Sequence, residues 1–162
     1  MNKAALALIS IGMYHPDPDF YPKVQTSGSS GFDLRAWWPH EGDFAVLAGQ
    51  TKLVPTGLRI VVPVGFESQI RMRSGLALYG DFFIPNSPST IDADFRGEVK
   101  VMVHAFRDVV FRMGDRIAQL VVAPVVTPYS DFFRASITHV ASPDDLPSSI
   151  RGDGGFGSTG LK

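Results

Sequence analysis

The clearest pattern of hydrophobic and polar positions in this chain lies in residues 99–106, where small apolar residues occupy every second position. A period of two places alternate side chains on opposite faces of a strand. The pattern therefore predicts a β-strand with two different faces. One face carries Val99, Val101, Val103 and Ala105, and the other face carries Lys100, Met102, His104 and Phe106.

Short β-rich segments continue on both sides of this strand, and glycine or proline bounds most of them. The chain contains 12 prolines and 16 glycines along its whole length, and proline is disfavoured in helix interiors because it lacks an N–H donor. One short helix fits at residues 73–79, where Ser74 is a candidate N-cap. Further strands are predicted at residues 45–47, 52–54, 58–62, 67–71 and 117–122. Many short strands at this spacing predict an all-β sandwich or jelly roll.

The composition of the sequence changes after Val126. Residues 142–149 are rich in Ser, Pro and Asp, and residues 151–160 carry too few large side chains to pack a core. A chain of 162 residues that is 44% hydrophobic is sufficient for one domain with a buried core. The sequence therefore predicts a β core at residues 1–141 and a flexible C-terminal arm at residues 142–162.

The composition excludes several classes of function. Fifteen basic and sixteen acidic residues give a formal net charge of −1, which argues against direct nucleic-acid binding because that requires a basic surface. The chain has no cysteine, so disulfides, thiolate zinc sites and cysteine nucleophiles are excluded. No apolar run reaches the roughly 18 residues of a membrane span. We expect no membrane association, and the cytoplasm is the default location.

The glycine-rich end of the chain carries the first candidate chemistry. Backbone N–H groups beside glycine can surround phosphate oxygens because no Cβ obstructs them. Residues 152–159 resemble a P-loop only superficially, since the lysine is missing. What remains is a cation at Arg151, an aromatic ring at Phe156 and hydroxyls at Ser158 and Thr159. Those groups suit a triphosphate attached to a base, and a solvated glycine-rich tail is the alternative interpretation.

Two more polar segments lie in the middle of the chain. Residues 71–75 combine two arginines, a hydroxyl and a glycine at one turn. Asp92 and Asp94 stand close together before an aromatic residue, although this spacing alone is more typical of a turn than of a catalytic pair. Asp115 and Arg116 are interpreted as a local structural ion pair at the start of a core strand.

Taken together, these segments resemble the five ordered motifs of the trimeric dUTP diphosphatases, or dUTPases, from about Val24 to Gly160. The matching segments are Ser30–Ala36, Arg73–Ala77, Thr90–Val99, Gly114–Leu120 and Arg151–Gly160. The resemblance implies an all-β, jelly-roll-like distorted β-barrel and a homotrimer with shared active sites. Enzymes of this family cleave dUTP to dUMP and pyrophosphate with Mg²⁺. They thereby limit uracil incorporation into DNA and supply dUMP for dTMP synthesis.

The resemblance also implies roles for individual residues. Asp92 matches the general base that would deprotonate a water for attack at the α-phosphorus. Asp33 matches a carboxylate that contacts Mg²⁺ through water, which suits an ion that keeps much of its hydration shell. Arg151 would reach the γ-phosphate as a second catalytic residue, and Asn86 matches the asparagine that contacts uracil. Phosphate contacts match Arg73, Ser74, Gly75 and Gln119, and the substrate contacts of the arm match Phe156, Gly157, Ser158 and Thr159.

Phe95 is the one departure from the family pattern that bears on the substrate. The family usually has tyrosine at this position, where the ring lies against the deoxyribose and leaves no room for a 2′-hydroxyl. Phenylalanine keeps the apolar face and loses only the hydroxyl. Discrimination against UTP should therefore survive, and it is looser if the tyrosine hydroxyl normally holds the ring in place.

Two other functions are compatible with parts of this sequence. A dCTP deaminase of the same fold would attack C4 of cytosine, but that branch lacks the glycine-rich fifth motif, which is present here. A non-catalytic jelly-roll module that senses nucleotide or binds a regulatory protein would not need Asp92, Arg151 and Gln119 together. An assay that separates pyrophosphate release from ammonia release distinguishes the two enzymes.

Overall fold

Eleven short strands account for most of the regular structure in residues 8–130 and 134–149, which the computed structural model describes. One short α-helix, α1 (Ser74–Tyr79), and two 3-10 helices, η1 (Pro18–Phe20) and η2 (Pro143–Asp145), complete these residues. The prediction of an all-β chain with at most one short α-helix is confirmed. The strands are β1 (Gly12–Tyr14), β2 (Phe32–Arg35), β3 (Phe44–Val46), β4 (Thr51–Pro55), β5 (Arg59–Val61), β6 (Phe66–Arg71), β7 (Phe82–Phe83), β8 (Ser89–Ile91), β9 (Lys100–Ala105), β10 (Val109–Phe111) and β11 (Arg116–Pro124).

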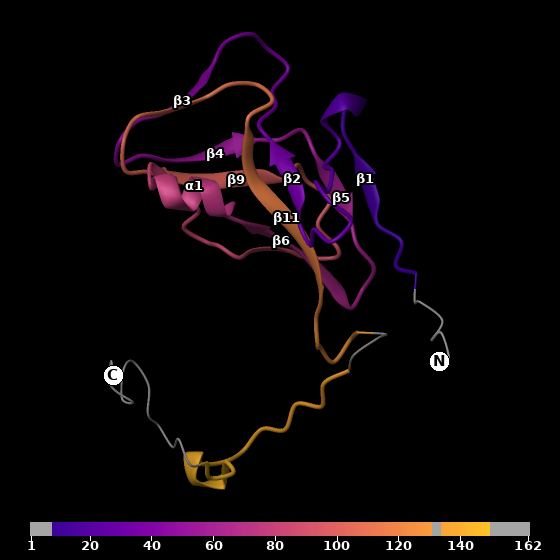
Figure 1. Ribbon diagram of the computed structural model, residues 1–162. Coiled ribbons are helices and arrows are strands. Elements are labelled where there is room, and N and C mark those ends of the chain that lie inside the picture. The colour runs from indigo at the N-terminus through magenta and orange to yellow at the C-terminus, as the bar shows by residue number, and fades with distance from the viewer. Residues whose placement is uncertain (1–7, 131–133, 150–162) are drawn as a thin grey trace.

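The strands form antiparallel sheets around one core (Figure 1). The largest sheet has the order β2-β11-β6-β8, and a second sheet has the order β4-β9-β7. Two strand pairs, β1-β5 and β10-β3, complete the arrangement. Among the described residues the hydrogen-bonded sheets remain separate and do not close into a barrel, which is consistent with a jelly-roll-like fold.

The strand at residues 99–106 behaves as its pattern predicts. Val101, Val103 and Ala105 of β9 are fully buried, and Val99 just before the strand is 1% exposed. These side chains pack against Val54 and Leu58 in the main hydrophobic cluster. Burial of this face stabilises the core because apolar surface leaves water, worth about 25 cal/mol for each Å².

Strand β11 determines which polar residues meet. It is nine residues long and pairs with β2 on one side and with β6 on the other. This double pairing places Gln119 directly opposite Asp33 of β2 and opposite Arg71 of β6. The register thus brings the first motif, on β2, and the fourth motif, on β11, side by side. Both lie next to the end of β6, which leads into the second motif.

Two local predictions are wrong. Ser74 does not cap α1, because the helix begins at Ser74 itself and the N-cap position is Arg73, whose side chain makes no capping bond. Asp115 and Arg116 do not pair with each other. The Asp115 carboxylate accepts a hydrogen bond from the Arg112 backbone N–H at 2.8 Å, which closes a turn, and Arg116 reaches across to Asp33.

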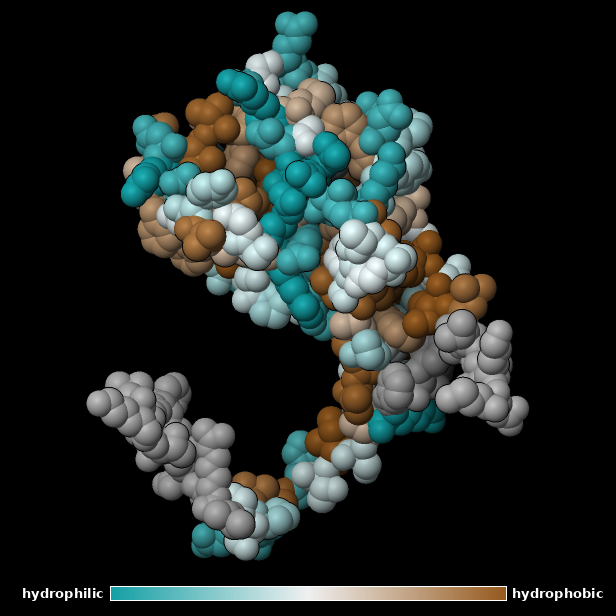
Figure 2. Space-filling model, viewed as in Figure 1, coloured by the Kyte–Doolittle hydropathy of each residue, from teal (hydrophilic) through white to brown (hydrophobic). Residues whose placement is uncertain are grey.

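After β11 the described residues 134–142 lead away from the body as an extended segment to η2 (Figure 1). Ser142 caps η2 with a capping box. Hydrophobic surface follows the chain between the body and η2 in the space-filling view (Figure 2). The large apolar side chains that are exposed after β11 are Val126, Tyr129, Ile137, Val140 and Leu146. The division between a core at 1–141 and an arm at 142–162 stays a prediction, because residues 150–162 lie outside the described part.

Among the described residues, no helix has the length and apolar character needed to cross a bilayer.

Candidate active site

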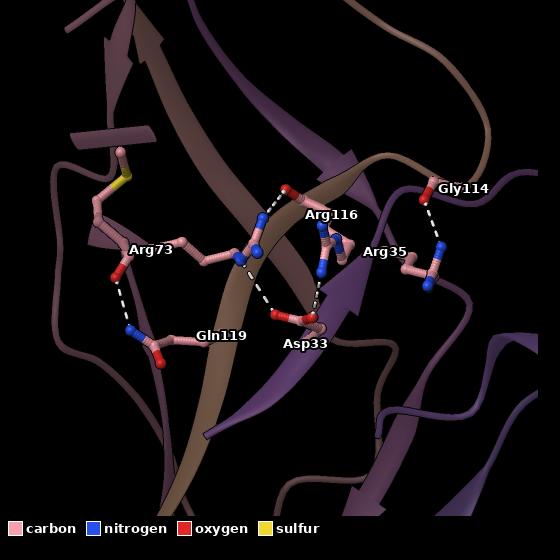
Figure 3. Close-up of polar contacts among 7 residues, drawn as sticks. Asp33, Arg35, Arg73, Gly114, Arg116 and Gln119 are labelled. Atoms are coloured by element: carbon pink, nitrogen blue, oxygen red, sulfur yellow. Dashed lines mark hydrogen bonds and ion pairs between the residues drawn. The ribbon is translucent and has the colours of Figure 1, made fainter. Parts of the chain in front are cut away.

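A cluster of charged side chains lies where β2, β11 and the start of α1 meet (Figure 3). The Asp33 carboxylate accepts an ion pair from Arg73 Nε at 3.0 Å on Oδ1 and another from Arg116 Nη1 at 3.2 Å on Oδ2. Asp33 is 9% exposed, whereas the side chains of Arg73 and Arg116 are 28% and 42% exposed. One buried carboxylate therefore holds two partly exposed guanidinium groups, and the cluster keeps one net positive charge.

Further hydrogen bonds fix the same cluster. Arg73 Nη1 donates to the Arg116 carbonyl oxygen at 3.3 Å, and Gln119 Nε2 donates to the Met72 carbonyl oxygen at 2.8 Å. Gly31 leaves room for the Gln119 side chain, because a Cβ on Gly31 would lie 2.5 Å from Gln119 Oε1. The loop before β2 and the strand β11 thus approach each other as closely as a glycine allows.

Gly31, Asp33, Arg73 and Gln119 line a cavity of about 410 Å³. We call this cavity, together with the Arg116 side chain that pairs with Asp33 behind it, the phosphate half of the site. Hydrophilic residues form a band across this face of the molecule, over β2 and β11 (Figure 2). Five of the residues that sequence reasoning placed at the phosphates or the metal line the cavity, namely Asp33, Arg73, Ser74, Gly75 and Gln119. Positive charge and exposed backbone at a helix start suit an anionic ligand.

A second cavity of about 260 Å³, which we call the base half, opens between β8 and the β4-β9 pair. Asp92 and Phe95 line it, together with apolar side chains such as Leu53 and Ile70. Asn86 stands at the turn before β8 and is exposed, and its Nδ2 donates to Ser89 Oγ at 2.9 Å. The predicted base and sugar contacts therefore lie in one continuous segment that contains β8, which pairs with β6, and Asn86 contacts the cavity lining through Ser89.

Local backbone bonds shape the loop that carries Asp92. The Phe95 N–H donates to the Asp92 carbonyl oxygen at 3.1 Å, and Arg96 Nη1 donates to the Ala93 carbonyl oxygen at 2.7 Å. The Phe95 ring lies over Gly97, where a Cβ would come within 2.5 Å of Phe95 Cζ. The Asp92 side chain is exposed, and its carboxylate forms neither a hydrogen bond nor an ion pair within the described residues.

Within one chain the two halves stay apart. Asp33 lines only the phosphate cavity, while Asp92 lines the base cavity and a wider, shallower one of about 780 Å³ that also holds Asp94. Among the described residues, the phosphate cavity shares no lining residue with either of the other two. The predicted residues Arg151, Phe156, Gly157, Ser158 and Thr159 lie outside the described part of the chain.

The described residues fit a hydrated metal ion better than a protein cage. They contain no group of three or more His, Asp or Glu side chains that could hold a metal ion. Both oxygens of Asp33 already face guanidinium groups, so the free lone pairs of this carboxylate suit water ligands rather than direct coordination. Mg²⁺ commonly binds in this way, with its water shell and substrate phosphates as ligands.

Sequence reasoning missed the role of Arg116 in this cluster. The residue belongs to the fourth motif, and its neighbour Asp115 offered a nearer partner in the sequence. Only the register of β11 against β2 shows that the guanidinium of Arg116 reaches Asp33 instead.

Comparison with known proteins gives the class of this fold and site. A sequence model of the dUTPase family matches residues 20–160. The chain is 48% identical over 141 residues to the deoxyuridine 5′-triphosphate nucleotidohydrolase of Anaeromyxobacter sp. (strain Fw109-5), and the aligned region covers 86% of each chain. It is 46% identical over 141 residues to that of Roseobacter denitrificans, again with 86% of both chains covered.

Solved structures agree on the fold. The G164S mutant of Staphylococcus bacteriophage 80alpha dUTPase, solved with dUpNHpp, has a TM-score of 0.74 at 16% identity and covers 94% of this chain and 99% of that one. The dUTPase of Streptococcus mutans has a TM-score of 0.61 at 24% identity and covers 70% and 94%. The chain belongs to the dUTPase family. It is an enzyme, a dUTP diphosphatase, and the dCTP deaminase alternative is thereby set aside.

Proposed function

We propose that this enzyme cleaves dUTP to dUMP and pyrophosphate at active sites that are shared between chains of a homotrimer. The observation that carries the proposal is the separation of the two halves within one chain, since Asp33 and Asp92 line different cavities. A triphosphate bound at Asp33, Arg73 and Gln119 would need a general base from elsewhere. The exposed Asp92 of a second chain supplies one.

The phosphate half binds and orients the triphosphate. Arg73 and Gln119 contact the phosphates, and the Ser74 hydroxyl and Gly75 backbone at the start of α1 bind the α- and β-phosphates. The net positive charge of the cluster offsets the substrate charge, and the ion pairs to Asp33 fix the guanidinium groups before substrate arrives. Such preorganised donors stabilise charge that develops in the transition state.

Magnesium takes part through the phosphates of the substrate. Mg²⁺ bound to the triphosphate neutralises charge on the phosphate oxygens, and Asp33 would accept hydrogen bonds from its water ligands. This role agrees with the donor set of the described residues, which lacks a cluster of three ligands.

The base half supplies the attacking water and the selection of the substrate. Asp92 takes a proton from a water whose oxygen forms a bond to the α-phosphorus, and the bond from that phosphorus to the α,β-bridging oxygen breaks. Pyrophosphate leaves with the bonding electrons. Phe95 packs against the deoxyribose, and Asn86 and the hairpin backbone select uracil.

The arm completes the site. Arg151 reaches the γ-phosphate and Phe156 stacks over uracil, while the Gly157 backbone and the hydroxyls of Ser158 and Thr159 close over the phosphates. The exposed apolar side chains of residues 126–146 support a trimer, because they would pack on a neighbouring chain. We propose that the enzyme acts in the cytoplasm, where it limits uracil incorporation into DNA and supplies dUMP.

A pyrophosphate-release assay with dUTP, dCTP, dTTP and UTP in the presence of Mg²⁺ tests the proposal. We expect release from dUTP far above the other three, and an Asp92→Asn variant that binds dUTP but turns it over about 10²- to 10⁴-fold more slowly. Asp94→Asn is the matched control, because Asp94 is also exposed in the same loop but lies outside the base cavity. Equal losses of turnover in the two variants would show that Asp92 is not the general base.

Mixing two inactive variants tests whether sites are shared. Arg73→Ala damages the phosphate half and Asp92→Asn damages the base half. If sites combine two chains, co-refolding the two variants creates some sites with both halves intact, and activity returns. Each variant refolded alone is the control. An inactive mixture that forms mixed trimers would show that both halves of a site come from one chain.

A further inference from the structure

The Ser89 side chain points into the base cavity. It precedes Ile91 by two positions in β8, so both side chains lie on the same face of the strand. Ile91 is 8% exposed and belongs to the core, and Ser89 stands opposite the buried Ile70 of β6. Ser89, Ile91 and Ile70 all line the cavity of about 260 Å³.

A hydrogen bond from Asn86 makes the Ser89 hydroxyl oxygen an acceptor on one side, which leaves the hydroxyl hydrogen as the donor. Asn86 Nδ2 donates to Ser89 Oγ at 2.9 Å across the turn, so one lone pair of the oxygen is occupied. The hydroxyl still carries one hydrogen. When a base fills the cavity and excludes water, that hydrogen needs an acceptor.

In the described part of the chain, four other polar residues line this cavity, namely Thr90, Asp92, Glu98 and Lys100. Thr90 lies on the opposite face of β8 from Ser89, and the carboxylates of Asp92 and Glu98 accept hydrogen bonds but donate none. Much of the lining is apolar, including Leu53, Ile70 and Val99. Lys100, the one cation that lines it among the described residues, is paired with Glu98 at 3.6 Å. A single hydroxyl can therefore have a measurable effect on which base is accepted.

We propose that Ser89 is a specificity-determining residue that donates a hydrogen bond to the C4 carbonyl of uracil. Cytosine has an amino group at C4, which is a donor and would face the donor hydrogen of Ser89. Asn86 then acts as a positioning residue, because it holds the serine oxygen from the other side. This inference rests on the proposed function, which places the pyrimidine in the base half.

The test compares kcat/KM for dUTP and dCTP in the full-length enzyme. For Ser89→Ala we expect kcat/KM for dUTP to fall about tenfold while the dCTP value stays the same or rises, because only uracil loses a hydrogen bond. Ser89→Thr keeps the hydroxyl and should retain most of the discrimination. Ser87→Ala is the matched control, since Ser87 is an exposed serine in the same turn.

Binding of dUMP and dCMP by calorimetry gives a second readout, and Asn86→Ala a second variant. We expect the preference for dUMP to fall in both variants. Asn86 is itself proposed to contact uracil, so Ser89→Gly, which also removes the hydroxyl, carries the test if Ser89→Ala does not fold. Equal losses for the uracil and cytosine nucleotides would overturn the inference, because a purely structural role or a contact at the C2 carbonyl affects both. Failure of the proposed function is a different result, in which the unmodified enzyme releases no pyrophosphate from dUTP.

Discussion

The two halves of the site are built in different ways. The phosphate half joins Asp33, Arg73, Arg116 and Gln119, which come from three separate segments and are held by ion pairs and hydrogen bonds. In the base half, the residues with a predicted role lie in one continuous segment, residues 86–95, and its loop is shaped by bonds between near neighbours, such as those of Arg96 to the Ala93 and Phe95 carbonyl oxygens.

This difference matches the tasks that we propose for the two halves. Groups that stabilise charge work best when they are fixed before the reaction, and Asp33 fixes Arg73 and Arg116 in that way. A general base must instead remain free to approach water and accept its proton. Asp92 is exposed and makes no polar side-chain contact within the described residues. Variants that disturb one half and spare the other can test this distinction.

The largest expected effect comes from the segment that would close over both halves. Deleting residues 151–162 should leave the fold intact and reduce turnover of dUTP by about 10³-fold, because an arginine clamp on a transferring phosphate contributes on that scale. Pyrophosphate release measures the loss, and thermal denaturation checks the fold. Undiminished turnover in the truncated enzyme would show that the two halves suffice without the arm.

Arg116→Ala should have the next largest effect, and it affects the phosphate half alone. Loss of one guanidinium leaves the buried Asp33 carboxylate paired only with Arg73, which then shifts away from the phosphates. We expect kcat/KM for dUTP to fall about 10- to 100-fold, the usual scale for a hydrogen bond to a charged group. Arg116→Lys should recover part of the loss.

Arg35→Ala is the matched control for this prediction. Arg35 lies beside the same cluster, but its Nη1 donates to the Gly114 carbonyl oxygen at 3.0 Å instead of pairing with Asp33 (Figure 3). A similar loss in both variants would indicate a general effect on local stability or charge rather than a specific role of Arg116.

The sequence predicted the fold better than the contacts. Alternation in residues 99–106 correctly predicted β9 and the division of its side chains between two faces, and the predicted strand at residues 117–122 lies within β11. Composition and turn residues gave the fold class. The short strands β2, β7, β8 and β10 were not predicted, because two to four residues carry too little periodicity to be recognised.

The contacts of the site were harder to predict because they depend on strand register. Motif resemblance named Asp33, Arg73 and Gln119, and all three line one cavity. The pairing of Arg116 with Asp33 joins residues 83 positions apart, and a shift of one residue in the sheet would abolish it. Local sequence favoured Asp115 as the partner, which the register excludes.

Gly31→Ala is a smaller disturbance of the phosphate half. The added Cβ would lie 2.5 Å from Gln119 Oε1, and the flexible end of the glutamine can turn away at little cost in stability. The hydrogen bond to the Met72 carbonyl oxygen would be lost, together with the proposed phosphate contact. We expect kcat/KM to fall about tenfold with nearly unchanged thermal stability. Gly28→Ala is the control, because no atom lies within 4 Å of the added Cβ.

Gly97→Ala should have the smallest effect on dUTP turnover, and it acts on the base half. The added Cβ would come within 2.5 Å of Phe95 Cζ and 3.0 Å of Phe95 Cε2. We expect the Phe95 ring to be pushed toward the cavity or tilted, because the added Cβ takes the space that the glycine leaves open under the ring. Turnover of dUTP should fall only a few-fold, since the phosphate half and Asp92 are untouched.

The informative measurement for Gly97→Ala is the ratio of kcat/KM for dUTP and UTP. A displaced ring no longer blocks the 2′-hydroxyl at its normal position, so this ratio should change several-fold more than the ratio for dUTP and dCTP, which depends on the base. Gly28→Ala again serves as the control. If both ratios stay constant, the Phe95 ring does not contact the sugar. If the dUTP/UTP ratio and the dUTP/dCTP ratio change together, the whole loop has moved. The contacts to the base and to the sugar would then depend on each other.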